Sequence, residues 1–153
     1  MTLRFKDRLR ILTASAGPLP AKRRVAGIIL GSLLAFAGVS HLSFARREFR
    51  SLVPDWVPAD RDAVVVASGV AEIGLGAALI ALPRHRVPVG LAVAAFFVAV
   101  FPGNIAQFLE RREAFGLDSD AARLSRLFFQ PLLVMWAAWS TGVVGALRRT
   151  RQR

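Results

Sequence analysis

The chain has 153 residues and a mass of 16.6 kDa, a length that fits a single domain. Apolar residues make up 54% of it before its 12 glycines are counted, and the mean hydropathy is +0.46, which excludes a disordered protein and argues against a soluble globular enzyme. The formal net charge of +11 fits either a nucleic-acid partner or a membrane surface, and the distribution of the charge decides between them.

Four apolar stretches are each long enough to cross a bilayer, which takes about 20 helical residues. They cover approximately residues 25–44, 63–82, 87–109 and 127–144. Because only helices and closed barrels satisfy their backbone hydrogen bonds in lipid, we expect an all-α integral membrane four-helix bundle. In this prediction a basic leader (1–24) precedes the transmembrane domain (25–147), and a basic tail (148–153) follows it.

Basic residues are divided unequally between the two ends of these spans. The leader, the turn at 83–86 and the tail hold 13 Lys and Arg residues against one acid, whereas the loops 45–62 and 110–126 hold eight basic and eight acidic residues. The positive-inside rule therefore predicts a multi-pass protein of the cytoplasmic membrane with both termini cytoplasmic and those two loops extracytoplasmic. We expect the basic termini to attract anionic lipid. Since the charges flank apolar spans instead of alternating with aromatic residues, nucleic acid is not an expected partner.

The first stretch contains His41, about one helical turn before its outer end. A lone histidine near an interface is more often a hydrogen-bonded residue than a ligand. A signal peptide is the alternative for this stretch, with Ala35–Ala37 as its cleavage site. The apolar run continues to Phe44 after a long leader, which favours a retained span.

The second stretch carries Glu72 at its middle. An acid near the centre of a membrane helix costs about 2.5–3.5 kcal/mol on insertion scales, so a neutral residue would insert more easily. Either Glu72 handles a proton or contacts a ligand, or it is protonated and hydrogen-bonds a neighbouring helix. Ser68, Gly69 and Gly76 share its helical face, which predicts close approach of another helix on that side.

The third and fourth stretches add polar residues at the same level as the first two. Pro102 is expected to kink the third helix and free a carbonyl, with Asn104 just beyond it. Gln130 opens the fourth stretch. The convergence of one polar residue per helix predicts an outward-facing polar pocket, formed by His41, Glu72, Asn104 and Gln130.

The loop at 45–62 is apolar and aromatic, with Phe49 and Trp56 as its prominent side chains. These two residues form either a lid over the pocket or ordinary aromatic anchors at the membrane interface. The chain has no cysteine, and one histidine beside one carboxylate supplies too few ligands for zinc or iron, so no metal site is expected.

The order of the motifs resembles the DoxX-like family of small four-helix membrane proteins. The matching segments span residues 25–141, and they are GVSH at 38–41, VPDWVP at 53–58, SGVAEIGLG at 68–76, FPGN at 101–104 and QP at 130–131. The resemblance implies a four-helix bundle in the cytoplasmic membrane, with the four polar pocket residues at the family's recurrent polar positions. The chain departs from the family pattern at Leu42, at Gly103, and at 45–48, where a common proline is missing.

The resemblance also directs the functional expectation. It implies an accessory subunit of a membrane redox assembly, a quinone-linked oxidoreductase, which anchors a redox partner protein and contacts a quinone or a proton in the polar pocket. The alternatives are a non-catalytic assembly factor or chaperone for membrane proteins, and a small-solute or proton permease that acts as an oligomer. Stand-alone catalysis is not expected, because the sequence offers neither a nucleophile nor a complete metal site.

Overall fold

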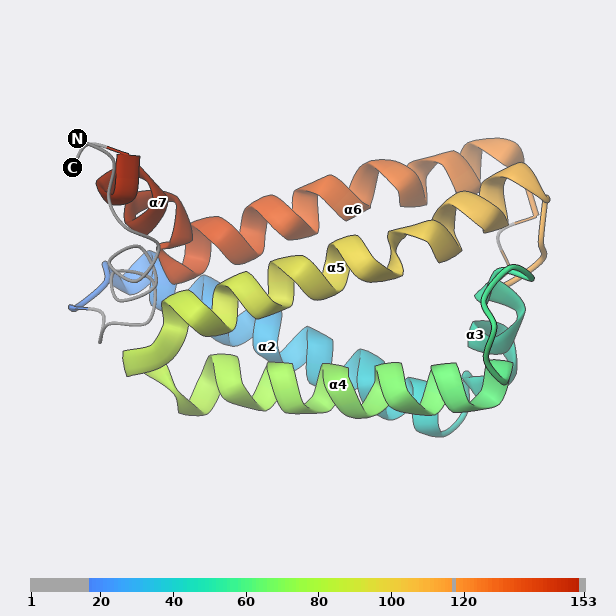
Figure 1. The fold of residues 1–153 in the computed structure, drawn as a ribbon, viewed down its shortest axis with the longest axis horizontal. Helices are drawn as coiled ribbons and strands as arrows, with labels where there is room; N and C mark the ends of the chain where they lie inside the picture. The colour runs from blue at the N-terminus through green and yellow to red at the C-terminus, as the bar shows by residue number, and fades with distance from the viewer. Residues whose placement is uncertain (1–16, 117, 152–153) are drawn as a thin grey trace.

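The computed structural model describes residues 17–116 and 118–151, and the regular structure in this part of the chain is entirely helical (Figure 1). Residues 1–16 of the expected leader and the last two residues of the expected tail lie outside the described range. Four long helices carry the fold: α2 (Ala21–Leu42), α4 (Arg61–Ala81), α5 (Arg86–Leu109) and α6 (Asp120–Thr141). The shorter elements are α3 (Arg46–Leu52), the 3₁₀ turn η1 (Pro83–His85) and α7 (Val143–Arg151).

Several of these helices are long and apolar enough to cross a membrane. Helices α2 and α4, together with the continuous segment of η1 and α5, satisfy this criterion individually. Helices α6 and α7 satisfy it only together, and they are bent by 71° from one another. The described residues therefore contain three such helices, or four if the bent pair forms one span.

Helix α6 differs in its bounds from the predicted span at 127–144. Helix α6 begins at Asp120, where the Ser119 hydroxyl accepts a hydrogen bond from the backbone N–H of Ala122 at 3.2 Å. It ends before Gly142, whose φ of 85° lies in the left-handed region that favours glycine. Because of this residue the chain turns into α7 instead of continuing as one straight span.

The long helices associate as two pairs. Helix α2 packs most extensively against α4, and α5 packs most extensively against α6. Figure 1 shows α4 and α5 close together at the η1 turn and farther apart toward the end where α3 lies. A central apolar cluster joins the pairs, made of Leu30, Leu34, Leu79, Val93, Phe97 and Ala137.

Glycines allow the backbones of α2 and α4 to touch. A Cβ atom added at Gly38 would lie 2.5 Å from the carbonyl oxygen of Gly69, and one added at Gly76 would lie 2.5 Å from that of Gly31. The two contacts are one heptad apart on each helix and run antiparallel. This confirms the prediction that another helix approaches the Glu72 face closely, and α2 is that helix.

Candidate functional site

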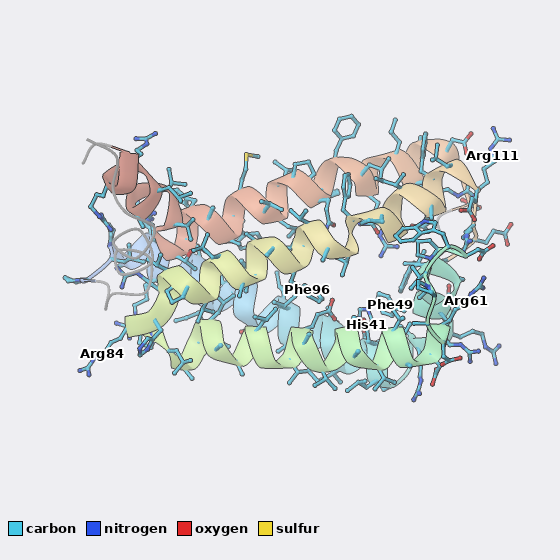
Figure 2. All side chains as sticks on the ribbon, viewed as in Figure 1. His41, Phe49, Arg61, Arg84, Phe96 and Arg111 are labelled. Carbon is cyan, nitrogen blue, oxygen red and sulfur yellow. The ribbon has the colours of Figure 1, made fainter. Side chains whose placement is uncertain are left out.

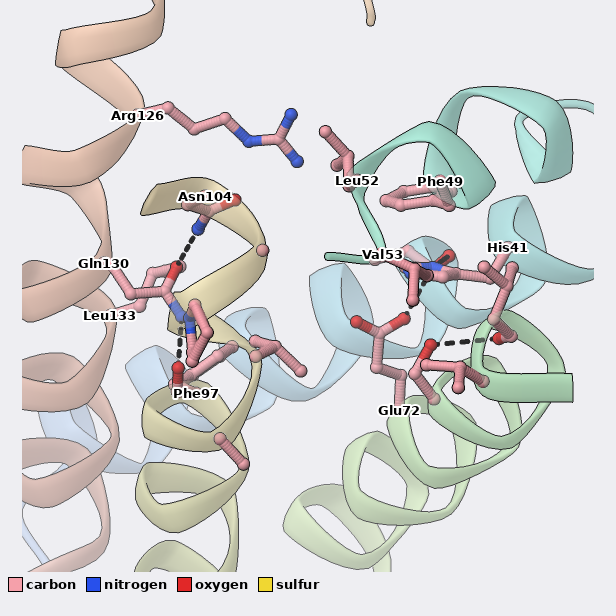
Figure 3. Close-up of a pocket in the computed structure, with 18 of the residues that line it drawn as sticks. His41, Phe49, Leu52, Val53, Glu72, Phe97, Asn104, Arg126, Gln130 and Leu133 are labelled. Carbon is pink, nitrogen blue, oxygen red and sulfur yellow. Dashed lines mark hydrogen bonds and ion pairs between the residues drawn. The ribbon is translucent and has the colours of Figure 1, made fainter. Parts of the chain in front are cut away.

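A cavity of about 480 Å³ lies between the two helix pairs, on the side where α3 crosses the bundle (Figure 3). Its size is within the range of roughly 300–1,000 Å³ typical of ligand pockets. Helices α2 to α6 all contribute to its wall, and most of its lining is apolar. The structure brings together in this wall all six residues that the sequence singled out: His41, Phe49, Trp56, Glu72, Asn104 and Gln130.

The α2–α4 wall carries a buried histidine and carboxylate. Nδ1 of His41 lies 2.9 Å from Oε2 of Glu72 and also 2.9 Å from the carbonyl oxygen of Ala37. The carbonyl can only accept, so the Nδ1 proton points to Ala37, and Glu72 Oε2 has no well-directed hydrogen bond from a described residue. Both side chains are about nine-tenths buried. A buried carboxylate requires a partner or a proton. The described neighbour of Oε2 is the His41 ring, with which it forms an ion pair when the imidazole is protonated, and the Glu72 side chain lines the cavity.

The α5–α6 wall carries two amides. Nδ2 of Asn104 donates to Oε1 of Gln130 at 3.0 Å, and the Gln130 amide donates to the carbonyl oxygen of Phe97 (Figure 3). These bonds orient the Asn104 side chain on the cavity wall. Helix α5 continues through Pro102. Proline has no N–H, so the backbone carbonyl of Val98, four residues earlier, has no helical hydrogen-bond donor. Gln130 contacts the neighbouring carbonyl, that of Phe97.

Helix α3 and the loop after it form the roof of the pocket. The ring of Phe49 stacks on that of His41, with centroids 3.3 Å apart and planes inclined by 16°. The ring of Phe115 in turn meets Phe49 edge-on at 4.7 Å. Trp56 lines the cavity but remains 69% exposed, so it lies at the outer surface. Phe49 therefore covers the polar pair directly, whereas Trp56 is at the margin.

Gly103 allows α3 to approach α5. A Cβ atom at this position would be 3.1 Å from the carbonyl oxygen of Leu52, the last residue of α3. The close approach provides a local reason for glycine at this position.

Arg126 is a site residue that sequence analysis counted only as a loop charge. It lies in α6 and lines the cavity, and Figure 3 shows its side chain extending from α6 toward Leu52. Nη1 donates to Oε1 of Gln107 at 3.1 Å, and the guanidinium lies 4.8 Å from the centroid of the Phe115 ring. Both partners are neutral, so Arg126 brings a positive charge to the pocket that no described carboxylate pairs with.

Arg112, also counted only as a loop charge, holds the roof in place. Its Nη1 donates to the carbonyl oxygens of Ser51 and Val53, both at 2.9 Å, and its side chain pairs with Asp55 and Glu110. Burial lowers the pKa of Arg112, but the hydrogen bonds to the two carboxylates outweigh it and raise the pKa above the ordinary value. The permanently charged Arg112 therefore ties the loop after α5 to the end of α3.

The two walls offer complementary chemistry to a ligand. The α5–α6 side supplies N–H donors, from the Asn104 amide and the Arg126 guanidinium. The opposite side supplies the acceptor oxygen of Glu72 beside His41. No group of three His, Cys, Asp or Glu side chains that would hold a metal ion occurs in the part of the chain that the structure describes. The arrangement suits a small amphipathic molecule that both accepts and donates hydrogen bonds.

Comparison with known proteins identifies the family. A family model described as a domain of unknown function, DUF8561, matches residues 30–141. The chain belongs to this family. The match runs from the middle of α2 to the end of α6, so it contains the whole pocket. No curated protein and no solved structure matches the chain.

Proposed function

We propose that this protein is a four-span protein of the cytoplasmic membrane and an accessory subunit of a quinone-linked redox assembly. In this proposal both termini are cytoplasmic, and α3 and the loop after α5 lie on the extracytoplasmic side. The redox role rests on the resemblance of the motifs at 38–41, 53–58, 68–76, 101–104 and 130–131 to the DoxX-like family. The observation that carries the proposal is the mostly apolar cavity with hydrogen-bond donors on one wall and the buried His41–Glu72 pair on the other.

A quinone head group fits this arrangement of side chains. Its ring is apolar and flat, and its carbonyl oxygens accept hydrogen bonds, which Asn104 and Arg126 offer from α5 and α6. A bound quinol would supply two electrons for a redox partner protein and two protons. Glu72 would accept one proton on its carboxylate, and Nε2 of His41, whose Nδ1 contacts the Ala37 carbonyl oxygen, would accept the other.

The remaining pocket residues orient the ligand and exclude water. Phe49 covers the ring of His41 from above, and Gln130 fixes the amide of Asn104. In this proposal the isoprenoid tail extends from the pocket into the surrounding lipid. Permease function, one of the two alternatives, requires a continuous polar path, and the apolar cluster around Leu34 and Val93 lies across the bundle below the pocket.

The experiment that tests the proposal is direct measurement of quinone on the purified protein. The protein is extracted in mild detergent, and the quinone-to-protein ratio is determined by mass spectrometry for the wild type, Asn104→Leu and Val98→Ala. We expect near-stoichiometric quinone on the wild type and on Val98→Ala, whose side chain faces outward and is 59% exposed. Asn104→Leu should lose at least four-fifths of it.

Titration with a short-chain quinone provides a second readout. Quinones quench tryptophan fluorescence, and Trp56 lines the pocket. We expect saturable quenching in the wild type and loss of the saturable component in Trp56→Phe. Absence of quinone from the wild type together with non-saturable quenching would overturn the redox proposal and favour an assembly factor or chaperone.

A further inference from the structure

One guanidinium lines the pocket with only neutral partners. Arg126 contributes to the cavity wall from α6 and is half-buried. Oε1 of Gln107 accepts a hydrogen bond from its Nη1 at 3.1 Å, and the centroid of the Phe115 ring lies 4.8 Å from the guanidinium. Neither contact neutralises the charge. A partly desolvated cation with neutral partners is best stabilised by an anion, and a ligand is the remaining source of one.

Three other arginines around the roof have carboxylate partners. Arg123, one turn before Arg126 on the same helix, pairs with Asp120 at 3.0 Å. Arg112 pairs with Asp55 at 2.9 Å, and Arg46 pairs with Asp62. These ion pairs leave Arg126 without a counter-ion among the described side chains. The position of the unpaired charge therefore coincides with the pocket wall.

The contacts of Arg126 hold its side chain and leave most of its donors available. A guanidinium has five N–H donors, and the described residues accept from Nη1 alone. Figure 3 shows the group extending from α6 across the pocket toward Leu52. The Asn104 amide, oriented by Gln130, adds a neutral donor on the same wall. An anionic group can therefore bind here through charge-assisted hydrogen bonds.

Away from Arg126 the cavity wall is mainly apolar. Leu34 and Phe97 of the central cluster line it from below. Leu33 of α2 and Phe129 of α6 also line the cavity, and they are 52% and 61% exposed. The apolar lining thus continues from the charged group to side chains on the outer surface of the bundle. A molecule with an anionic head group and an apolar chain matches this arrangement.

We propose that the pocket also binds a long-chain carboxylate, an amphiphile of the fatty-acid type, with its head group on Arg126. The alkyl chain lies along Leu34 and Phe97 and leaves the cavity past Leu33. A carboxylate accepts two parallel hydrogen bonds from one guanidinium. Its single negative charge matches one unpaired cation, whereas a phosphate monoester carries about −1.5 to −2 at pH 7.

The proposal goes beyond the redox role and does not depend on it. The carboxylate and the quinone head group occupy the same cavity, so binding of one excludes the other. A long-chain carboxylate therefore acts as a competitive regulator of the quinone site.

Direct binding of a matched acid and alcohol tests the proposal. Dodecanoic acid and dodecanol share their alkyl chain, and at mildly alkaline pH only the acid is ionised. Radiolabelled forms of both are titrated onto the purified protein in mild detergent, and binding is followed by scintillation proximity. We expect the wild type to bind the acid at least tenfold more tightly than the alcohol. Equal affinities would overturn the proposal.

Arg126→Gln should reduce this preference to less than twofold, through loss of affinity for the acid. Affinity for dodecanol should stay within twofold of the wild type, which shows that the pocket of the variant is still folded. A preference for the acid that survives in Arg126→Gln would overturn the proposal, as would an equal loss of affinity for both molecules.

Arg111→Gln is the matched control. Arg111 is 74% exposed, lies at the end of the bundle (Figure 2) and is not part of the cavity wall. The preference for the acid should stay within twofold of the wild type. A loss as large as in Arg126→Gln would mean diffuse charge attraction instead of a site. Displacement of dodecanoic acid by acetate at the same concentration would overturn the assignment to an amphiphile.

The quinone and carboxylate proposals fail separately. We expect dodecanoic acid to displace bound quinone more effectively than dodecanol does. A wild type that carries no quinone but shows the Arg126-dependent preference would overturn the redox proposal alone. Stoichiometric quinone that dodecanoic acid does not displace would overturn the carboxylate proposal alone.

Discussion

Glu72 and Asn104 face one pocket from different helix pairs and offer opposite hydrogen-bonding chemistry. The carboxylate oxygen of Glu72 accepts, whereas the amide nitrogen of Asn104 donates. A quinone carries carbonyl oxygens that accept, and the corresponding quinol carries hydroxyl groups that donate. The two residues should therefore discriminate between the two oxidation states of the ligand in opposite directions.

Glu72→Gln tests this at the level of one oxygen atom. We expect it to weaken quinol binding about tenfold, since a hydrogen bond to a charged group contributes about 1.5–3 kcal/mol. Quinone binding should stay within twofold of the wild type. Fluorescence titration with a short-chain quinone, followed by its displacement with the reduced form, measures both affinities. Asn104→Leu is the control with the reverse preference, and an equal loss of both forms in Glu72→Gln would make Glu72 a packing residue.

The polar pocket residues could be identified from the sequence because each polar side chain is costly to insert into a membrane span. A carboxylate or amide within a membrane span carries an insertion cost that makes it conspicuous. Arg126 gave no such signal, because the fourth span was expected to begin near residue 127 and the arginine was counted with the loop. Helix α6 begins at Asp120 instead, so Arg126 lies within the helix and lines the pocket. Arg112 was missed because its partners lie about sixty residues away in the chain.

At the scale of elements, the α2–α4 pair depends on glycine at two matched positions. Gly38→Ala places a methyl group against the Gly69 carbonyl oxygen and the Ile73 nitrogen, which are backbone atoms that cannot rotate away. We expect a loss of about 1–3 kcal/mol in the free energy of unfolding. Unfolding in detergent mixtures, followed by circular dichroism, measures it.

Gly74→Ala is the matched control on the same pair of helices. A Cβ atom there meets nothing within 4 Å. Alanine favours the helix over glycine by roughly 0.5–1 kcal/mol, so this variant should be slightly more stable than the wild type. Equal stability of the two variants would show that the close backbone approach does not limit the packing of α2 on α4.

The roof over the pocket depends on Arg112 more than on its own helix, because α3 has only seven residues. Arg112→Leu removes the donors to the carbonyl oxygens of Ser51 and Val53. We expect hydrogen exchange of backbone amides at 46–57 to accelerate at least tenfold, corresponding to about 1.4 kcal/mol of lost local stability. Exchange measured by mass spectrometry on the detergent-solubilised protein provides the test.

The neighbouring arginine separates this effect from simple loss of charge. Arg111 is 74% exposed and forms one ion pair, with Asp120 at 3.2 Å. Arg111→Leu should leave exchange at 46–57 unchanged, since surface ion pairs contribute little. Acceleration of the same size in both variants would mean that the roof is not held by the bonds of Arg112.

Periodicity and hydropathy predicted the long helices, and glycine spacing predicted the close contact on α4. They did not predict the break at Gly142, because a single glycine inside an apolar run is also tolerated within a helix. The left-handed φ and the packing of Val143 against Val87 decide the direction of α7, and both are tertiary features. The stacking of Phe49 on His41 likewise depends on how α3 folds back over α2.

For the whole molecule, the separation of charge between the two ends predicts its orientation in the membrane. The chain contains no cysteine, so single cysteines report their surroundings without background. In intact cells, a membrane-impermeant maleimide should label Arg47→Cys in α3, on the proposed outer side, and should label Arg84→Cys in η1 only after lysis. Both positions are exposed. Labelling in the reverse order would overturn the proposed topology.

The division of the bundle into two helix pairs has a consequence for handling the protein. The pocket occupies the seam where the pairs are least attached to one another, and a ligand there contacts both sides. A bound ligand therefore holds the two helix pairs together, and the unfolding temperature should rise with ligand concentration even when no single contact is strong. A detergent that strips lipids and small amphipathic molecules also removes the pocket ligand. The same chain should therefore unfold at a higher or a lower temperature according to the detergent used to extract it.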